Sequence, residues 1–273
     1  MAIITVSREL AALGDETAHE LANLLKYRLV DKKCLEEQMK DLGVTERKIE
    51  KYDERKPSFW ASLSQDRDDY LHYLRTAIFS EAGQGNRVFI GRGCAAILRD
   101  VPGTLSVFLA APGDIRLERV KSYFHCDERR ARQIIEQSDR DRQGFHQYFF
   151  EMSWKGPDNY HLCLNTGKFH PGLCAALIKA AVEKNVSEET AAAGALRLKD
   201  LLLGQRVVHR ILYEKNIPIH FLEAAVKSGA VTLFGVTGSQ SLVEAAILGA
   251  NEVPAVSSVK AEIQVVQEYS VAP

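Results

Sequence analysis

Short apolar segments alternate with amphipathic ones along the first two thirds of the chain. Residues 3–6 form a β-branched run typical of a buried strand, and apolar residues between 17 and 25 then recur at helical spacing. The same alternation predicts further strands at 29–31, 87–91, 104–110 and 161–165, with helices over 32–56, over 67–82, from 114 onward and over 171–184. Five short strands separated by helices predict an α/β fold with a doubly wound parallel sheet.

The pattern changes in the last third of the chain. A helix is expected over 196–213, followed by strands at 219–226 and 231–236 that are joined by a hairpin turn at Lys227-Ser228-Gly229. Gly238-Ser239 can begin a second helix, and strict alternation over 260–265 predicts a half-buried final strand. We therefore expect a first domain over 1–184, a small α+β domain over 196–273, and a linker or helix extension over 185–195.

Composition excludes several classes of protein. The 35 basic and 36 acidic side chains give a net charge of −1, which disfavours a nucleic-acid binder built on bulk positive charge. We find no long apolar stretch and no leader of the secretory type, so we expect no membrane role and a cytoplasmic location. The five cysteines are widely spaced, and this favours reduced thiols over a disulfide framework or a metal site.

Polar residues collect where the predicted strands end. In doubly wound sheets, ligands bind at the carboxyl ends of the strands. The segments that follow predicted strands here are Ser7-Arg8-Glu9, Asp31, Gly91-Arg92 and Asn165-Thr166. The sequence thus places candidate binding groups at the edge of the sheet where the architecture predicts a site.

The first of these segments leads into a helix, whose amides would attract an anion. Laid on a Walker A loop, Glu9 stands at the first glycine, Gly14 at the second, and Asp15 at the lysine. Glu16 stands at the hydroxyl residue, and Thr17 comes one place later. The spacing alone therefore does not predict a phosphate-binding loop.

Several motifs taken together point to one family. They are Ile3-Ile4-Thr5-Val6-Ser7-Arg8-Glu9, Tyr27-Arg28-Leu29-Val30-Asp31, Lys56-Pro57-Ser58-Phe59-Trp60, Gly91-Arg92-Gly93, Ser138-Asp139-Arg140-Asp141-Arg142, and the segment 160–167. Over most of residues 1–180 the chain resembles the cytidylate kinase-like family. The resemblance implies a P-loop-kinase-like five-stranded sheet with a helical lid. It also implies transfer of the ATP γ-phosphoryl group to CMP or dCMP, with Mg²⁺ as cofactor.

Carried over position by position, the resemblance assigns the site residues. Those expected to wrap the donor phosphates are Ser7, Arg8, Glu9, Gly14, Asp15, Glu16 and Thr17, and Thr17 would also hold Mg²⁺. Those expected at the acceptor nucleotide are Asp31, Gly91, Arg92 and Gly93. The arginines expected in a mobile lid are Arg129, Arg132, Arg140 and Arg142. Phosphoryl transfer needs mainly positioning and charge neutralisation, so the implied catalytic residues are Arg92, Arg132, Arg140 and Arg142.

The loop departs from the family pattern, and a second interpretation stays open. Ala11 and Leu13 stand where the family has glycines, and Asp15 and Glu16 add negative charge beside a polyphosphate. His161 stands where the family often has an aspartate before the fifth strand. The alternative to a kinase is a catalytically weak or inactive sensor that binds a nucleotide or another anion.

Each group also has a structural interpretation. Ser7 and the acids Asp15-Glu16 could cap a helix and complement its dipole, and Asp31 could cap another helix. Residues 116–142 carry many charges of both signs, so they could form a solvated, salt-bridged helical face instead of a phosphate lid.

The C-terminal region resembles a BON domain over about 196–266. The segments that carry this resemblance are 229–235 and 253–259, together with the predicted order of helix, hairpin, helix and strand. The resemblance implies binding of phospholipid or of a small ligand. We expect ligand sensing or self-association here, and we expect no catalytic residue in this domain. A third possibility is a structural or envelope-associated adaptor that works through this domain.

Overall fold

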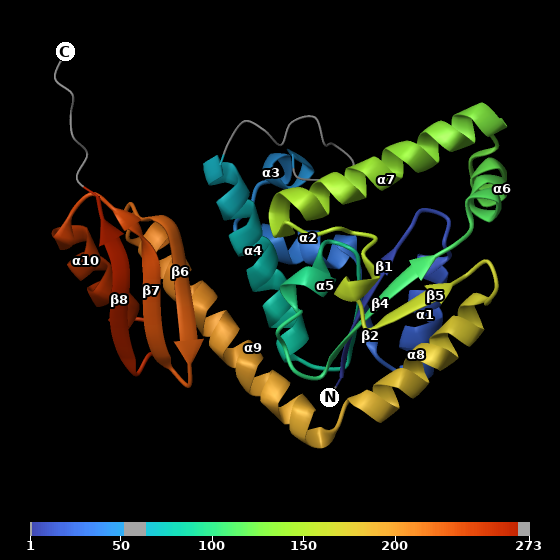
Figure 1. Ribbon diagram of the computed structural model, residues 1–273. Helices are drawn as coiled ribbons and strands as arrows, with labels where there is room; N and C mark the ends of the chain where they lie inside the picture. The colour runs from blue at the N-terminus through green and yellow to red at the C-terminus, as the bar shows by residue number, and fades with distance from the viewer. Residues whose placement is uncertain (1, 52–63, 267–273) are drawn as a thin grey trace, which may run out of the picture. The chain divides into compact units, whose positions relative to one another are not determined.

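The computed structural model describes residues 2–51 and 64–266 (Figure 1). The chain divides into two compact units, Met1–Gly194 and Ala195–Pro273, and each is described by itself. Most of the stretch expected as a linker is helical, because α9 (Glu188–His209) begins inside it, as in the helix-extension alternative. The motif at Lys56–Trp60 lies outside the described residues.

The first unit is built on a parallel sheet of five strands. The strands are β1 (Ile3–Arg8), β2 (Arg28–Val30), β3 (Arg87–Ile90), β4 (Thr104–Ala110) and β5 (Leu162–Asn165). Their spatial order is β2-β3-β1-β4-β5, and every neighbouring pair is parallel. The doubly wound parallel sheet predicted from the sequence is confirmed.

Helices connect these strands. They are α1 (Gly14–Leu25), α2 (Lys32–Asp41), α3 (Glu46–Lys51), α4 (Ser64–Gly83), α5 (Cys94–Ile97), α6 (Gly113–Phe124), α7 (Glu128–Phe150) and α8 (Pro171–Asn185). In Figure 1, α1 and α8 cover one face of the sheet, and α4 and α5 lie on the other. The long α7 and the preceding α6 span the residues that were expected to form a helical lid. No helix in the described part of the chain is long and apolar enough to cross a bilayer.

Both faces of the sheet are buried, as the apolar strands predict. Successive side chains of a strand point to opposite faces, so Ile4 and Val6 pack toward α1 and α8 in one core cluster. Phe108, on the opposite face, contacts the rings of Trp154 and Tyr160. Trp154 is 1% exposed. The sheet is therefore a rigid support for the loops at its carboxyl edge.

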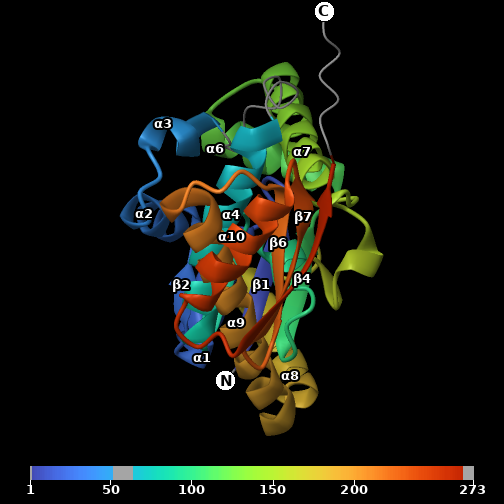
Figure 2. The same ribbon diagram turned by 90° about the vertical axis from the view of Figure 1, so that its left-hand side faces the viewer.

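The second unit has its own sheet and core. Its elements after α9 are a π-helical turn (Arg210–Glu214), β6 (His220–Lys227), β7 (Ala230–Thr237), α10 (Gln240–Asn251) and β8 (Ser258–Val265). β6 and β7 pair antiparallel and are seen side by side in Figure 2, and β8 pairs parallel with β7. Ser228 and Gly229 form the expected two-residue turn, with φ of 51° and 83°. The small α+β domain predicted here is confirmed.

Candidate functional site

The loop between β1 and α1, residues 9–13, has a backbone shape that glycine favours, although it contains no glycine. Ala11 and Leu13 adopt left-handed φ values of 60° and 51°. Left-handed backbone costs a residue with a side chain about 1 kcal/mol each. Gly14 begins α1 beneath the Arg8 side chain, and a Cβ there would lie 2.3 Å from Arg8 Cγ. Two residues with side chains thus hold a backbone conformation that glycine adopts most easily.

The carboxylate of Glu9 lies at the centre of this region. The Ala111 N–H donates to Glu9 Oε2 at 3.1 Å. Arg116 Nη1 and Lys155 Nζ donate to Glu9 Oε1 at 3.1 Å and 2.6 Å. The Glu9 side chain is 8% exposed. Three donors from three different segments thus hold one buried negative charge at the end of β1.

A second carboxylate closes the cluster. Asp139 accepts two hydrogen bonds from the Arg116 fork, at 2.7 Å and 3.0 Å, and one from Lys155 Nζ at 2.8 Å. We call Glu9, Arg116, Asp139 and Lys155 the charge cluster. It contains two positive and two negative side chains, so its net charge is zero. Its members lie just after β1, on α6, on α7 and in the segment after α7.

The cluster shifts the pKa of two of its members in opposite directions. Burial alone would raise the pKa of Asp139, but hydrogen bonds from Arg116 and Lys155 hold it below its ordinary value. Burial alone would lower the pKa of Lys155, but hydrogen bonds to Asp139 and Glu9 hold it above its ordinary value. Both groups are therefore charged at neutral pH.

Two further contacts tie α6 to the loop. Arg116 Nε donates to the Leu10 carbonyl at 2.9 Å. Arg119 Nη1 donates to the Ala11 carbonyl at 2.9 Å, and its Nη2 donates to the Thr166 carbonyl at 2.8 Å. Because both arginines occupy the same face of α6, the first turns of this helix fix the loop through its backbone oxygens.

The remaining donor-side residues named from the sequence lie around the same loop. Arg8 pairs with Asp15 at 3.3 Å, and Ser7 is buried at the end of β1. Glu16 is exposed in the first turn of α1. Thr17 is fully buried, and its hydroxyl donates to the Leu13 carbonyl at 2.7 Å. No side-chain hydrogen bond caps α1, so the capping interpretation of Ser7 is not what the structure shows.

Magnesium can be tested against the groups in this loop. Among the described residues, no three acidic, histidine or cysteine side chains are grouped as a metal site. The exposed Asp15 and Glu16 supply oxygen ligands of the kind that Mg²⁺ prefers, and Mg²⁺ commonly takes one or two carboxylates together with substrate phosphates. The residues present therefore fit an ion that arrives with a nucleotide.

The acceptor-side group centres on Arg92. Gly91, Arg92 and Gly93 follow β3 with consecutive left-handed φ values of 74°, 54° and 68°. Arg92 is 2% exposed, and it donates to Glu36 at 2.5 Å and to the Tyr70 hydroxyl at 3.4 Å. A Cβ at Gly93 would lie 2.3 Å from the Phe150 ring, so this position requires glycine.

Asp31 has a structural role in this conformation. Its carboxylate accepts a hydrogen bond from the Cys34 N–H at 2.9 Å and caps α2. Because β2 lies next to β3 in the sheet, Asp31 and Gly91 still end neighbouring strands at the same edge. The sequence interpretation of Asp31 as a helix cap is therefore the one that the contacts support.

The arginines of α7 are mostly paired along their own helix. Arg132 pairs with Glu128 at 2.6 Å, and Arg140 lies 3.9 Å from Glu136. Arg142 donates to Ser138 and lies over the Trp154 ring at 5.7 Å. The structure thus brings Asp139 of this motif to the loop, and it shows Arg132 and Arg140 on the salt-bridged helical face that the sequence left as an alternative.

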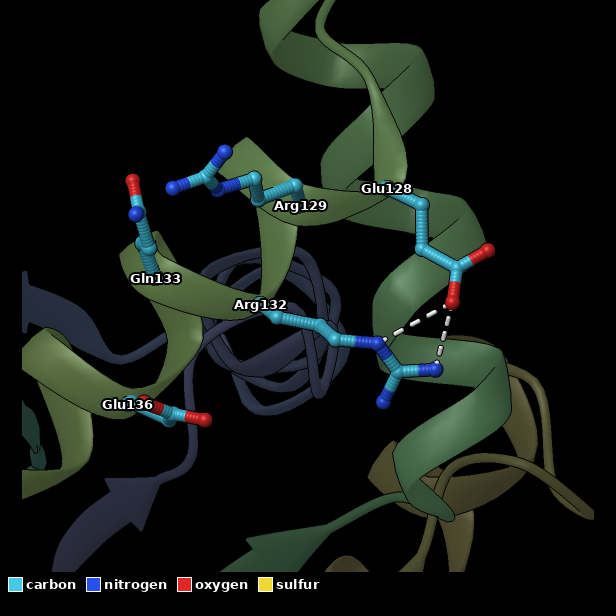
Figure 3. A pocket seen from close by; sticks show the side chains of 5 residues that line it. All are labelled: Glu128, Arg129, Arg132, Gln133 and Glu136. Atoms are coloured by element: carbon cyan, nitrogen blue, oxygen red, sulfur yellow. Dashed lines mark hydrogen bonds and ion pairs between the residues drawn. The ribbon is translucent and has the colours of Figure 1, made fainter.

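A shallow depression lies on this face of α7. Its volume is about 450 Å³, and its lining residues are Glu128, Arg129, Arg132, Gln133 and Glu136 (Figure 3). Figure 3 shows the guanidinium of Arg132 against the Glu128 carboxylate, with Arg129 and Gln133 directed elsewhere. Both charges are represented in its lining, so it lacks the positive character that a phosphate site needs.

Sequence reasoning missed the basic residues that contact the loop. They are Arg116, Arg119 and Lys155, and it also missed the acceptor-side acid Glu36. One local signal was available, because Arg116 and Arg119 are three residues apart in the helix that follows β4. Lys155 and Glu36 carry no such signal, since each reaches its partner through the tertiary fold.

Comparisons with known proteins bear on the family and the fold. The model of the cytidylate kinase-like family matches residues 3–168, and the BON domain model matches residues 199–267. A crystal structure of an uncharacterized protein from Eubacterium ventriosum is 23% identical, with a TM-score of 0.55, over 67% of this chain and 99% of that one. No curated protein matches the chain.

Two other solved structures are less similar to the chain. Shikimate kinase from Acinetobacter baumannii, in complex with shikimate, is 14% identical with a TM-score of 0.38, over 68% of this chain and 94% of that one. The YorR protein from Bacillus subtilis, in complex with phosphorylated GDP, is 13% identical with a TM-score of 0.39, over 67% of this chain and 96% of that one.

Proposed function

This chain belongs to the cytidylate kinase-like family, and from that membership we propose that its first unit binds ATP at the β1–α1 loop and phosphorylates a nucleoside monophosphate. CMP and dCMP are the proposed acceptors, as the family resemblance implies. One observation carries the proposal. Arg116, Arg119 and Lys155 come from two separate segments and converge on the loop that ends β1.

In the proposed reaction, the protein has mainly to position the two substrates and to neutralise negative charge. An oxygen of the acceptor phosphate attacks the γ-phosphorus of ATP, and the bond to the β–γ bridging oxygen breaks, which leaves ADP. Guanidinium and ammonium groups at the loop would neutralise charge on the transferring group. Mg²⁺ would enter with the nucleotide, with Asp15 or Glu16 as its protein neighbours, and would supply further charge neutralisation. Thr17, which the resemblance assigned to the ion, is fully buried here, and its hydroxyl donates to the Leu13 carbonyl.

Arg92 is the proposed partner of the acceptor phosphate. Its planar fork matches a phosphate bidentately, and it stands at the end of β3, next to β1 in the sheet. In this structure the fork holds Glu36, so binding of an acceptor would exchange a carboxylate for a phosphate. Arg132, Arg140 and Arg142 stay in the proposal as lid arginines that would reach the nucleotide through a movement of α7.

A second candidate function is favoured because the cations on the donor side and on the acceptor side are already paired with carboxylates. Arg116 and Lys155 hold Glu9 and Asp139, and Arg92 holds Glu36. A domain whose phosphate-binding cations are already neutralised could bind nucleotides weakly and without turnover, which is the sensor alternative. The proposed role of the BON domain, ligand sensing or self-association, is compatible with either candidate and stays a prediction.

A coupled assay of ADP release separates the two candidates. With ATP, Mg²⁺ and CMP or dCMP, a kinase releases ADP in an acceptor-dependent way, and Arg92→Ala abolishes this release. Arg206→Ala, an exposed arginine of the second unit, is the matched control and should retain the activity.

A thermal-shift screen of nucleotides completes the test. Stabilisation by a nucleotide without ADP release identifies the sensor. If no nucleotide raises the melting temperature and no ADP is released, both candidates are wrong.

A further inference from the structure

The Glu9 carboxylate is held as a bound anion would be held. A backbone N–H, one guanidinium N–H and an ammonium group converge on it at distances of 2.6–3.1 Å. These three kinds of donor are the ones that proteins use for phosphate oxygens. The donors come from the residue after β4, from α6 and from the segment after α7, so none of them belongs to Glu9's own segment.

We propose that Ala111 N–H, Arg116 and Lys155 form a phosphate-binding site in which the Glu9 carboxylate is a resident, competing anion. A phosphate of a polyphosphate ligand enters by displacing the Glu9 side chain. The proposal deepens the function given above and rests on it for the chemical class of the ligand. It makes Glu9 the residue that sets how tightly this chain binds its ligand.

The charges explain why displacement is needed. With Glu9 in place, two cations face two carboxylates, and an incoming polyanion meets no net positive charge. With Glu9 displaced, Arg116 and Lys155 face Asp139 alone, and the site has a net charge of +1. Asp139 stays on the far side of the fork through its two bonds to Arg116, so it continues to orient the guanidinium.

The fold allows the side chain to leave without disturbing the sheet. The Glu9 backbone is anchored separately, because its N–H donates to the Leu109 carbonyl at 3.0 Å. Rotation about side-chain bonds therefore suffices to free the site. A resident anion on the same chain is present at high effective concentration and therefore occupies the site for most of the time. The apparent affinity of a competing phosphate is reduced because it can bind only during the fraction of time in which the site is open.

The test measures binding of a polyphosphate without nucleotide chemistry. Tripolyphosphate is titrated calorimetrically, in the absence of Mg²⁺, into the full chain and into Glu9→Gln. Removing the competing charge should tighten binding about tenfold, which corresponds to about 1.4 kcal/mol. Glu20→Gln, an exposed acid on α1, makes the same change of charge away from the cluster and should leave the affinity unchanged.

Two additional variants keep the test decisive. The double variant Glu9→Gln/Lys155→Gln should lose the gain, because it removes one of the three donors. If circular dichroism shows that Glu9→Gln does not fold, Glu9→Asp replaces it. This variant keeps the charge but is too short to reach all three donors, and it should show a smaller gain of about threefold.

Two results would overturn the proposal. One is an affinity for tripolyphosphate that is the same in the wild type and the Glu9 variants, and the other is an equal gain in Glu20→Gln. Failure of the proposed phosphoryl transfer gives a different pattern, since ADP release can be absent while the Glu9 variants still bind tripolyphosphate more tightly.

Discussion

Basic side chains on α6 and α7 fall into two groups whose surroundings differ. The Arg116 side chain is 5% exposed, and it is held by acids from β1's end and from α7. Arg132 and Arg140 are more than 60% exposed, and they pair with acids one turn away on their own helix. Arg116 therefore connects distant parts of the fold, whereas Arg132 and Arg140 form ion pairs on the surface of one helix.

The difference shows what an arginine contributes in each setting. A buried guanidinium between two carboxylates cannot be removed without stranding both charges in a poorly solvated place. A surface arginine that loses its partner is simply hydrated, so its pair contributes little. A count of arginines along the lid therefore does not identify those that define the site.

Arg116→Ala should reduce the free energy of unfolding more than any other change proposed here. If it does not, the contrast between the two groups of arginines is wrong. It leaves Glu9 and Asp139 near Lys155 alone, and we expect a loss of about 3–5 kcal/mol in the free energy of unfolding. Urea unfolding at pH 7 measures it. Arg116→Lys keeps the positive charge but lacks the guanidinium fork, so its free energy of unfolding should lie between those of the wild type and Arg116→Ala. A loss below about 1 kcal/mol would show that the charge cluster is not structurally important.

Acid pH should selectively reduce the stability that the buried charge cluster contributes. The pKa of Asp139 is lower in the folded chain than its ordinary value of about 4, so its stabilising contribution is complete above that value. The contribution is lost as the pH falls through the lowered pKa of the folded state. Unfolding of the wild type and Asp139→Asn should therefore differ clearly at pH 7 and progressively less below about pH 4. A difference that stays constant down to pH 2 would contradict the assignment.

Arg132→Ala should give the smallest effect. Its partner Glu128 is exposed and can be solvated, so we expect a change within about 0.5 kcal/mol by the same urea measurement. A loss as large as that of Arg116→Ala would mean that the surface group supports the fold as well, and the comparison would fail.

Much of the architecture could be predicted from local patterns. The β-branched run at 3–6 and the helical spacing after Thr17 correspond to β1 and α1, and the turn at Ser228-Gly229 corresponds to a hairpin. These features depend on residues that are close in sequence, where side-chain periodicity and backbone preference act directly.

The interior of the site could not be predicted in this way. Glu9 was expected beside the donor phosphates, but its partners Ala111, Arg116 and Lys155 are 102, 107 and 146 residues away. No spacing rule links residues so far apart, and the choice among the many arginines of 116–142 depends on which ones the fold buries. Arg92 was easier to single out, because it stands between two glycines at a strand end.

A titration of ATP with Mg²⁺ tests most directly whether the buried cations form the nucleotide site. The proteins compared are the wild type, Lys155→Gln and Lys179→Gln, an α8 lysine that pairs with Glu183 on its own helix. We predict that the wild type binds, that Lys155→Gln binds about tenfold more weakly, and that Lys179→Gln matches the wild type. Equal affinities in all three proteins, or no binding in any of them, would contradict the account.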